Sequence, residues 1–217
     1  GITAAWCYAC SHFSFNGSSK KRKKTKSKLK ERNLINQYID LIRSWNATHN
    51  LVSKDQANNL QEHIEDSLSI FSLTGPVLVD IGSGGGFPGI PIAIKGPERK
   101  VVLVDSNQKK ISFLLNSINR LGLKNVTIIH ARIEDVDPRE LPQNYELVAR
   151  ALGTTQHITD LTKNHLNNSG TKLQLMKTKG QMKDEKLPPG YIIKKINKLP
   201  SKEKNKERIL VTIEKDG

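Results

Sequence analysis

Residues 77–91 read VLVDIGSGGGFPGIP, and this stretch decides the fold class of the chain. A short apolar run ends at Asp80, and a second apolar run begins near Pro88. Four glycines lie between them, and three of these occupy alternate positions: Gly82, Gly84 and Gly86. Glycine lets a backbone turn approach a ligand where a Cβ atom would collide. A helix that starts after such a turn presents unpaired N–H groups and the positive end of its dipole. The stretch therefore predicts a strand, a ligand-binding turn and a helix.

The chain that follows alternates between strand and helix patterns. Strands are expected at residues 77–81, 100–105, 126–131, 146–152 and 171–176, and helices at residues 109–121 and 156–166. This order implies an α/β fold with a mostly parallel sheet and helices on both of its faces. Residues 191–199 and 208–214 are expected to complete a seven-stranded sheet as a C-terminal antiparallel addition.

Two helices are expected before the sheet. The first carries one apolar stripe at three- and four-residue steps, formed by Leu34, Tyr38, Leu41, Ile42 and Trp45. The second carries Leu60, Ile64, Leu68 and Phe71 and ends at Gly75-Pro76. Trp45 completes the stripe, so we interpret it as a core residue rather than a base-stacking one. Residues 33–217 are thus expected to form one domain, with N-terminal helices in 33–75 and the α/β core in 76–217.

Charge is distributed unevenly along the 217 residues. The 35 Lys and Arg and 21 Asp and Glu give a formal net charge of +14. Residues 1–32 carry a net +8, residues 33–171 a net −1 and residues 172–217 a net +7. Such blocks of charge favour a polyanionic partner that touches the ends or one face of the protein. Residues 1–32 are expected to form a basic, disordered tail, with nuclear targeting or RNA binding as its alternative roles.

Two features of the composition exclude other classes. No apolar run approaches the roughly 20 residues of a membrane-spanning helix, so no membrane protein is expected. Two cysteines, Cys7 and Cys10, are too few for a disulfide framework. Together with His12 they offer three conceivable zinc ligands, but no fourth lies nearby, so no metal site is expected.

A nucleoside-containing cofactor is indicated by Asp105, which ends the next expected strand. A carboxylate there can accept hydrogen bonds from both hydroxyls of a ribose. Residues 84–89, GGGFPG, also fit the dinucleotide pattern G-x-G-x-x-G, but they start after the turn at Gly82. Asp80 would repel a pyrophosphate, whereas it suits a ligand with a cationic amino-acid end. S-adenosylmethionine is such a ligand and is the expected cofactor, with a dinucleotide or a purely structural turn as the alternatives.

Further motifs occur in order along the chain. They are Trp45-Asn46…Asn50-Leu51, His63-Ile64-Glu65-Asp66-Ser67, Asp80-Ile81-Gly82 through Phe87-Pro88-Gly89-Ile90-Pro91, Val104-Asp105-Ser106, Arg132-Ile133-Glu134, Arg150-Ala151 and Lys179-Gly180-Gln181. Together they resemble the RsmG family, also called glucose-inhibited division protein B, over roughly residues 29–217. Two departures are visible, because residues 1–28 have no counterpart and Thr178 interrupts the apolar approach to Lys179.

The resemblance implies a class I, Rossmann-like methyltransferase that uses S-adenosylmethionine. Its implied product is 7-methylguanosine at the guanine in position 527, in the 530 loop of 16S ribosomal RNA. The implied partner is the small ribosomal subunit, and the protein is expected to be a cytoplasmic monomer. By position, the implied cofactor-site residues are Gly82, Phe87, Ile133, Glu134 and Arg150. Asp80 and Asp105 fit the acidic positions of the wider methyltransferase class, with Gly84 and Gly86 in the turn between them.

This chemistry needs no general base. Guanine N7 carries an in-plane lone pair and no proton at neutral pH, so it can attack a sulfonium methyl group directly. No catalytic residue is assigned, because alignment of the reacting atoms can supply the rate. Arg150 is the candidate for substrate positioning, with an ion pair to Glu134 or Asp135 as the structural alternative. His63 is interpreted either as a capping or core hydrogen-bonding residue or as a substrate contact.

Two other functions stay open. One is an inactive RNA- or ribosome-binding protein of the same fold, and the other is a dehydrogenase. Binding of S-adenosylmethionine would argue against both, since the first would bind no cofactor and the second would bind NAD.

Overall fold

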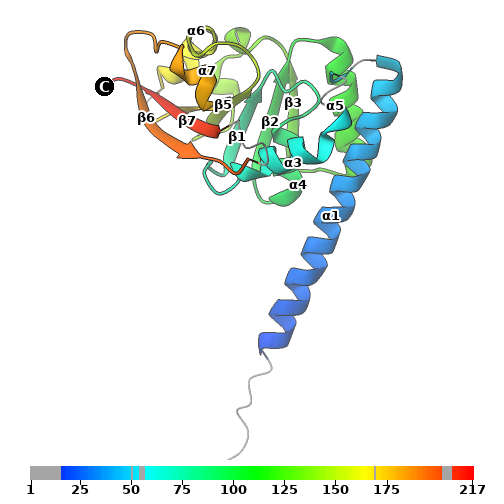
Figure 1. Ribbon diagram of the computed structural model, residues 1–217. Helices are drawn as coiled ribbons and strands as arrows, with labels where there is room; N and C mark the ends of the chain where they lie inside the picture. Colours follow the sequence, from blue (N-terminus) through cyan, green and yellow to red (C-terminus); the bar gives the residue numbers. More distant parts are fainter. Residues whose placement is uncertain (1–15, 50, 54–56, 169, 202–206) are drawn as a thin grey trace, which may run out of the picture.

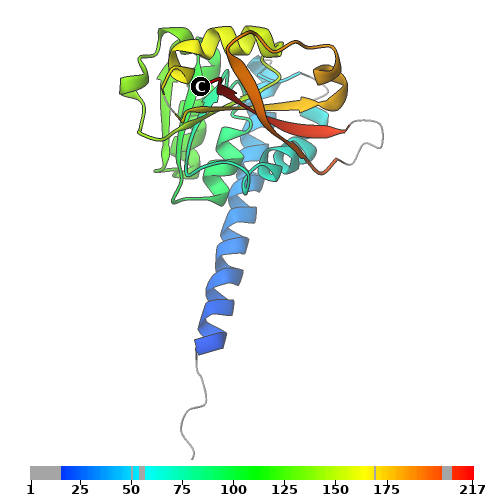
Figure 2. The same ribbon diagram turned by 90° about the vertical axis from the view of Figure 1, so that its left-hand side faces the viewer.

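The computed structural model describes residues 16–49, 51–53, 57–168, 170–201 and 207–217. Its helices are α1 (Asn16–His49), α3 (Leu60–Ser69), α4 (Gly89–Lys95), α5 (Gln108–Leu121), α6 (Thr155–Leu166) and α7 (Lys179–Lys183), with two 3-10 helices, η1 (Ile133–Asp135) and η2 (Pro138–Glu140). Its strands are β1 (Val77–Ile81), β2 (Lys100–Asp105), β3 (Val126–His130), β4 (Glu146–Arg150), β5 (Lys172–Thr178), β6 (Tyr191–Lys198) and β7 (Arg208–Lys215). The helices surround one sheet, and the N-terminal part of α1 stands away from the body (Figures 1 and 2).

The seven strands lie in the order β3-β2-β1-β4-β5-β7-β6. Strands β1 to β5 pair in parallel, whereas β7 is antiparallel to both β5 and β6. The expected α/β fold, with a mostly parallel seven-stranded sheet and a C-terminal antiparallel strand, is therefore confirmed. The chain moves from β1 to β2 and β3 on one side and then returns to β4 on the other side of β1. Parallel sheets bind ligands at the carboxyl ends of the strands beside such a reversal.

Alternate side chains of the central strands pack on opposite faces of the sheet. Leu78 and Leu103 belong to a core that they share with α1, α3, α4 and α5. Val79 and Val102 belong to a second core that they share with α6 and η1. Because both faces are covered, the strands are apolar along most of their length.

The N-terminal segment differs from the disordered tail expected for residues 1–32. Residues 16–32 form the first half of α1, whose second half buries Ile35, Tyr38 and Ile42 in the core. Lys and Arg are good helix formers, and no glycine or proline interrupts the chain from Ser18 to His49. A helix anchored by packing can therefore propagate through the basic run. Residues 1–15, with Cys7, Cys10 and His12, lie outside the described residues.

Two further findings concern the end of strand β4 and the length and hydropathy of the helices. Strand β4 ends at Arg150, two residues before the expected end, because Ala151 adopts a positive φ of 54° and turns the chain. Within the described residues, no helix has the length and hydropathy needed to span a bilayer.

Candidate functional site

The glycine turn lies at the carboxyl end of β1, where the strand order reverses. Gly82 has a φ of 65°, and a Cβ atom built there would lie 2.5 Å from Leu152 Cδ1. Gly84 also has a positive φ, of 57°, but a Cβ atom there would meet nothing closer than 3.7 Å. The turn thus packs tightly against Leu152 at Gly82, whereas the space beside its backbone is open at Gly84. This open backbone is where a ligand can approach.

Asp80 offers an unsatisfied acceptor beside this turn. Its side chain is buried, and Oδ2 accepts a hydrogen bond from Gly89 N–H over 3.0 Å. The other oxygen, Oδ1, is buried and has no hydrogen-bond partner among the described residues. Burial raises the pKa of Asp80 from 3.8 to about 7, while the bond from Gly89 opposes that shift. A buried carboxylate oxygen without a donor is suited to a cationic ligand group.

Asp105 ends β2 and connects the glycine turn to the start of α5. Its Oδ2 accepts from Gly84 N–H over 2.8 Å, and its Oδ1 accepts from Asn107 N–H over 2.9 Å. Lys110 Nζ lies 3.9 Å from Oδ2. Each carboxylate oxygen can accept a second hydrogen bond, so Asp105 can both hold the turn and receive ligand hydroxyls.

Ile133 and Glu134 lie in η1, which follows β3 at the same edge of the sheet. Ile133 is buried, and its carbonyl oxygen accepts from His165 Nε2 over 3.0 Å. His165 is buried in α6, and its Nδ1 accepts from the Tyr145 hydroxyl over 2.8 Å. Burial lowers the pKa of His165, so the neutral ring that makes both bonds is favoured. His165 therefore holds η1 in place, a role that the sequence analysis missed.

Arg150 is the last residue of β4 and has a partner that we did not expect. Its Nε lies 3.2 Å from Asp66 Oδ2, and its Nη2 donates to His63 Nδ1 over 2.5 Å. The structural alternative, an ion pair with Glu134 or Asp135, is therefore wrong, because the acidic partner of Arg150 is Asp66. The arginine contacts α3 instead, through the side chains of His63 and Asp66. His63 makes a side-chain hydrogen bond with Arg150, in line with one of its two interpretations, and the other, substrate contact, stays a prediction.

Asp66 is shared by two arginines. Its Oδ2 also lies 3.3 Å from Arg208 Nη1 of β7, and its side chain is only 7% exposed. The carboxylate thus joins α3 to two strands of the sheet. Burial lowers the pKa of the Arg150 guanidinium, whereas the charge of Asp66 raises it.

Phe87 connects this ion cluster to the glycine turn. Its ring centroid lies 5.5 Å from the Arg150 guanidinium carbon and 6.1 Å from the His63 ring. The ring centroid of Tyr38 lies 5.6 Å from that of Phe87. The Tyr38 hydroxyl donates to Gly85 O over 2.5 Å, so α1 directly supports the turn. Tyr38 was expected only as a member of the apolar stripe, because its contact with a residue 47 positions away leaves no local signal in the sequence.

Trp45, from the same stripe, has the core role that we expected. Its ring packs edge-on against Phe113 of α5, with centroids 5.7 Å apart. It is partly buried and packs against the core shared by α1 and α5.

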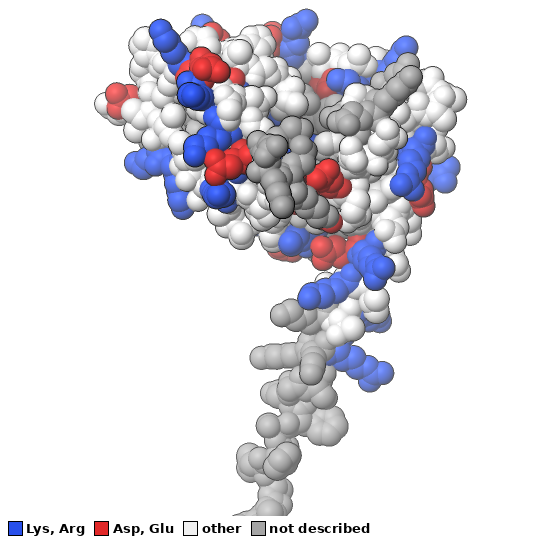
Figure 3. Space-filling model, viewed as in Figure 1, with Lys and Arg blue, Asp and Glu red and all other residues white. Residues whose placement is uncertain are grey.

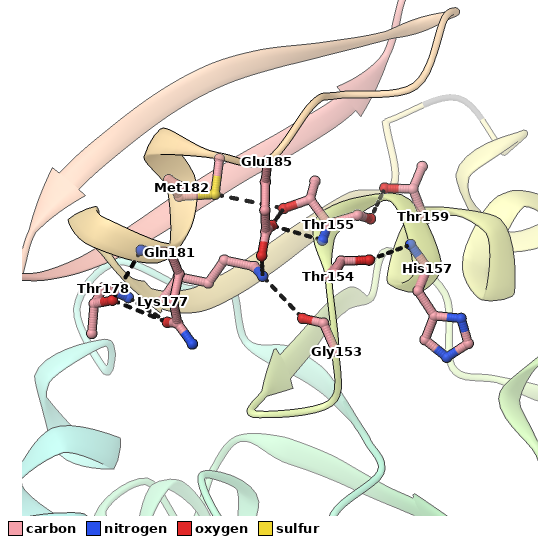
Figure 4. A network of polar contacts seen from close by, with 10 residues as sticks. All are labelled: Gly153, Thr154, Thr155, His157, Thr159, Lys177, Thr178, Gln181, Met182 and Glu185. Carbon is pink, nitrogen blue, oxygen red and sulfur yellow. Dashed lines mark hydrogen bonds and ion pairs between the residues drawn. The ribbon is translucent and has the colours of Figure 1, made fainter.

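The loop after β4 is held by a polar network that the sequence analysis also missed (Figure 4). Lys177 of β5 is buried, and its Nζ donates to Gly153 O over 3.0 Å and to Glu185 Oε1 over 2.8 Å. Glu185 Oε2 accepts from Thr155 N–H over 2.8 Å and from the Thr155 hydroxyl. The network therefore ties the segment after Arg150 to β5 and to the start of α6. No sequence signal would have paired these residues, because β5, the loop after β4, the start of α6 and the segment after α7 meet only in the folded chain.

The structure thus brings the predicted site residues to one edge of the sheet. Asp80, the glycine turn, Phe87, Asp105 and Arg150 surround the carboxyl ends of β1, β2 and β4. Ile133 and Glu134 stand beside them after β3. Within the described ranges, no group of three or more His, Cys, Asp or Glu residues is placed to hold a metal ion. What these residues bind stays a prediction.

The chain is similar in sequence to known proteins. A family model described as rRNA small subunit methyltransferase G, GidB, matches residues 31–210. A ribosomal RNA small subunit methyltransferase G of Nitrosomonas europaea is 39% identical over 153 residues, which cover 70% of this chain and 71% of that protein. The protein of the same name from Hydrogenovibrio crunogenus is 37% identical over 180 residues, which cover 82% of each chain.

Solved structures are similar in fold. A mutant of MtNAS in complex with S-adenosylmethionine has a TM-score of 0.57 and 15% identity, and the match covers 88% of this chain and 78% of that one. TrmN from Thermus thermophilus has a TM-score of 0.50 and 18% identity, over 70% of this chain and 48% of that one. At these identities the likeness concerns the fold alone.

Proposed function

Because the chain belongs to the GidB family of rRNA small subunit methyltransferases, we propose that it methylates N7 of the guanine in position 527 of 16S ribosomal RNA. The observation that carries this proposal is the open glycine turn between Asp80 and Asp105, beside Arg150. The proposed partner is the small ribosomal subunit, and the protein is proposed to act on it as a cytoplasmic monomer.

S-adenosylmethionine is the proposed cofactor, and when bound it supplies an electrophilic methyl group on a sulfonium sulfur. Asp80 Oδ1 fits its ammonium group, because this buried oxygen lacks a donor among the described residues. Asp105 fits the ribose hydroxyls, and the open backbone at Gly84 leaves room for a ligand to pass. A pyrophosphate would meet the Asp80 carboxylate instead, which argues against a dehydrogenase.

The chain's own contribution to methyl transfer is orientation. Guanine N7 needs no deprotonation at neutral pH, so no residue is required as a general base. Arg150 is proposed to position the base, because its guanidinium stands at the end of β4 beside Phe87. Asp66 and His63 hold that guanidinium in one orientation. Such fixed geometry lowers the barrier by removing the orientational entropy of the reacting groups.

Mass mapping of methylated nucleosides in 16S ribosomal RNA tests the proposed target. Small subunits from cells that lack this protein should gain 7-methylguanosine at position 527 when they are incubated with the protein and S-adenosylmethionine. Calorimetry with S-adenosylmethionine and NAD separates the alternatives at the same time. Binding of NAD alone would support the dehydrogenase, and binding of neither ligand would support the inactive RNA-binding protein.

Asp105→Ala should weaken S-adenosylmethionine by roughly 1.5–3 kcal/mol, about 10- to 150-fold in Kd, because charge-assisted hydrogen bonds to the ribose are lost. Asp105→Asn should weaken it less, since an amide oxygen can still accept from Gly84 N–H. Titration calorimetry measures both affinities, with thermal denaturation as the check on folding. Wild-type affinity in a folded Asp105→Ala variant would remove Asp105 from the cofactor site.

A further inference from the structure

The N-terminal half of α1 is the most strongly charged segment of the described chain. We call residues 16–32 the basic arm; nine of its residues are Lys or Arg, and Glu31 is its one acid. The side chains of Arg22, Lys26, Lys28 and Lys30 are all exposed. Figure 3 shows Lys and Arg side chains along the part of α1 that stands away from the body. The family match begins at residue 31, so the arm lies almost wholly outside it.

The arm has no apolar stripe with which it could pack against protein. Successive helical residues are about 100° apart, so Arg22, Lys28 and Lys30 point in three different directions. The second half of the same helix is different, because Ile35, Tyr38 and Ile42 form its buried stripe. A helix that is basic on all sides stays in water or meets a polyanion.

The charges of the arm oppose its helical structure. Arg22 and Lys26, Lys26 and Lys30, and Lys28 and Arg32 are like-charged pairs four residues apart, a spacing at which side chains are neighbours. The first turn contains no acidic residue, although the helix dipole favours negative charge at that end. Phosphates bound along the arm would relieve both effects. A local conflict of this kind is expected where a segment serves binding rather than folding.

The arm leaves the body at the edge opposite the glycine turn. Residues Ser27, Lys30, Glu31 and Leu34 line a cavity of about 390 Å³ together with the segments around Lys95 and Lys124. Those segments precede β2 and β3, so they mark the amino ends of the strands. Tyr38 meets the turn at the carboxyl ends. At a rise of about 1.5 Å per residue, Arg22 lies about 24 Å along the helix from Tyr38.

We propose that the basic arm binds the phosphate backbone of double-helical ribosomal RNA, at a place separate from the nucleotide that is methylated. This proposal rests on the proposed function, since it assumes that the substrate is ribosomal RNA. The arm contains no aromatic residue on which unpaired bases could stack. Phosphate contacts by Lys and Arg position a protein on RNA without reading its sequence. An anionic membrane fits less well, because an interfacial helix needs an apolar face and the arm offers only Leu29.

The test is a triple variant of the full chain, Arg22→Gln, Lys26→Gln and Lys28→Gln. Its matched control, Lys163→Gln, Lys186→Gln and Lys215→Gln, removes the same charge from exposed positions outside the arm. For binding to an RNA duplex, the slope of log K against log salt should become shallower by roughly 2 in the arm variant, because each phosphate contact contributes about 0.7–0.9. The control should keep most of the wild-type slope.

Turnover on small ribosomal subunits gives the second measurement. The arm variant should raise KM several-fold and leave kcat and the affinity for S-adenosylmethionine unchanged, whereas the control should change none of them. Equal slopes and equal KM values in the two variants would overturn the proposal. It would also be overturned if the arm variant lost binding to anionic lipid vesicles but kept the wild-type binding to duplex RNA. If wild-type protein does not methylate 16S RNA, the proposed function fails. The salt dependence of binding to duplex RNA would still test whether the basic arm binds RNA.

Discussion

At pH 7 S-adenosylmethionine should bind about 50-fold more tightly than at pH 5, because its ammonium group requires the ionised form of Asp80. Burial raises the pKa of Asp80 to about 7, so the carboxylate is almost wholly protonated at pH 5 and half ionised at pH 7. Above that pH the gain should level off, since an α-amino group itself begins to lose its proton. Titration calorimetry across this range measures the affinity and the protons released on binding.

The matched variant for this prediction is Asp80→Asn. It keeps an oxygen for Gly89 N–H but has no ionisable group, so its affinity should be low and independent of pH between 5 and 7. Asp40→Asn, at an exposed position of α1, should behave like wild type. An equally flat profile in the wild-type protein would show that Asp80 does not face a cationic group.

The same carboxyl group makes the cofactor-free protein less stable as the pH rises. In the unfolded chain Asp80 titrates near its ordinary pKa of 3.8, whereas in the folded chain its pKa is about 7. The folded state therefore binds more protons between about pH 4 and pH 7, and stability is lost as the pH rises through that window. Thermal denaturation should show this loss as a shrinking advantage of wild type over Asp80→Asn from pH 4.5 to pH 7.

Arg150→Ala should reduce kcat about 100-fold, because the target base would lose the group that aligns it. Its effect on stability should be smaller than that of Asp66→Ala. When Arg150 is removed, Asp66 keeps its ion pair with Arg208. When Asp66 is removed, both arginines lose their shared carboxylate, and breaking such a buried pair costs about 3–5 kcal/mol.

Single-turnover methylation and denaturant unfolding of both variants separate the two roles. Arg150→Lys is the conservative control, since it keeps the charge but loses the bond geometry that His63 and Asp66 impose. An Arg150→Ala variant that unfolds early and yet turns over normally when folded would make the ion pair purely structural.

Local sequence patterns were sufficient to predict most of the strands and helices of the fold. The residues around Asp80 and the alternate glycines identified the strand, the turn and the helix, and the later strand–helix alternation identified the sheet. The basic run at residues 18–32 differs most from its expected structure. Its composition indicates disorder, whereas the run is continuous with a packed helix and is itself helical. Composition reports the average solvation of a segment, whereas helix propagation depends on what the segment is attached to.

The sequence by itself determined which residues stand at the carboxyl edge of the sheet, because the ends of parallel strands meet there and glycine and aspartate leave a local pattern. Only the tertiary structure decided what holds them. Tyr38 reaches Gly85, Asp66 reaches Arg150, and Lys177 reaches Gly153 and Glu185. Periodicity within one element does not specify such pairs, since they form when separate helices and strands pack together. A residue at the candidate site can thus be predicted from its own strand, while its orientation depends on elements that lie elsewhere in the chain.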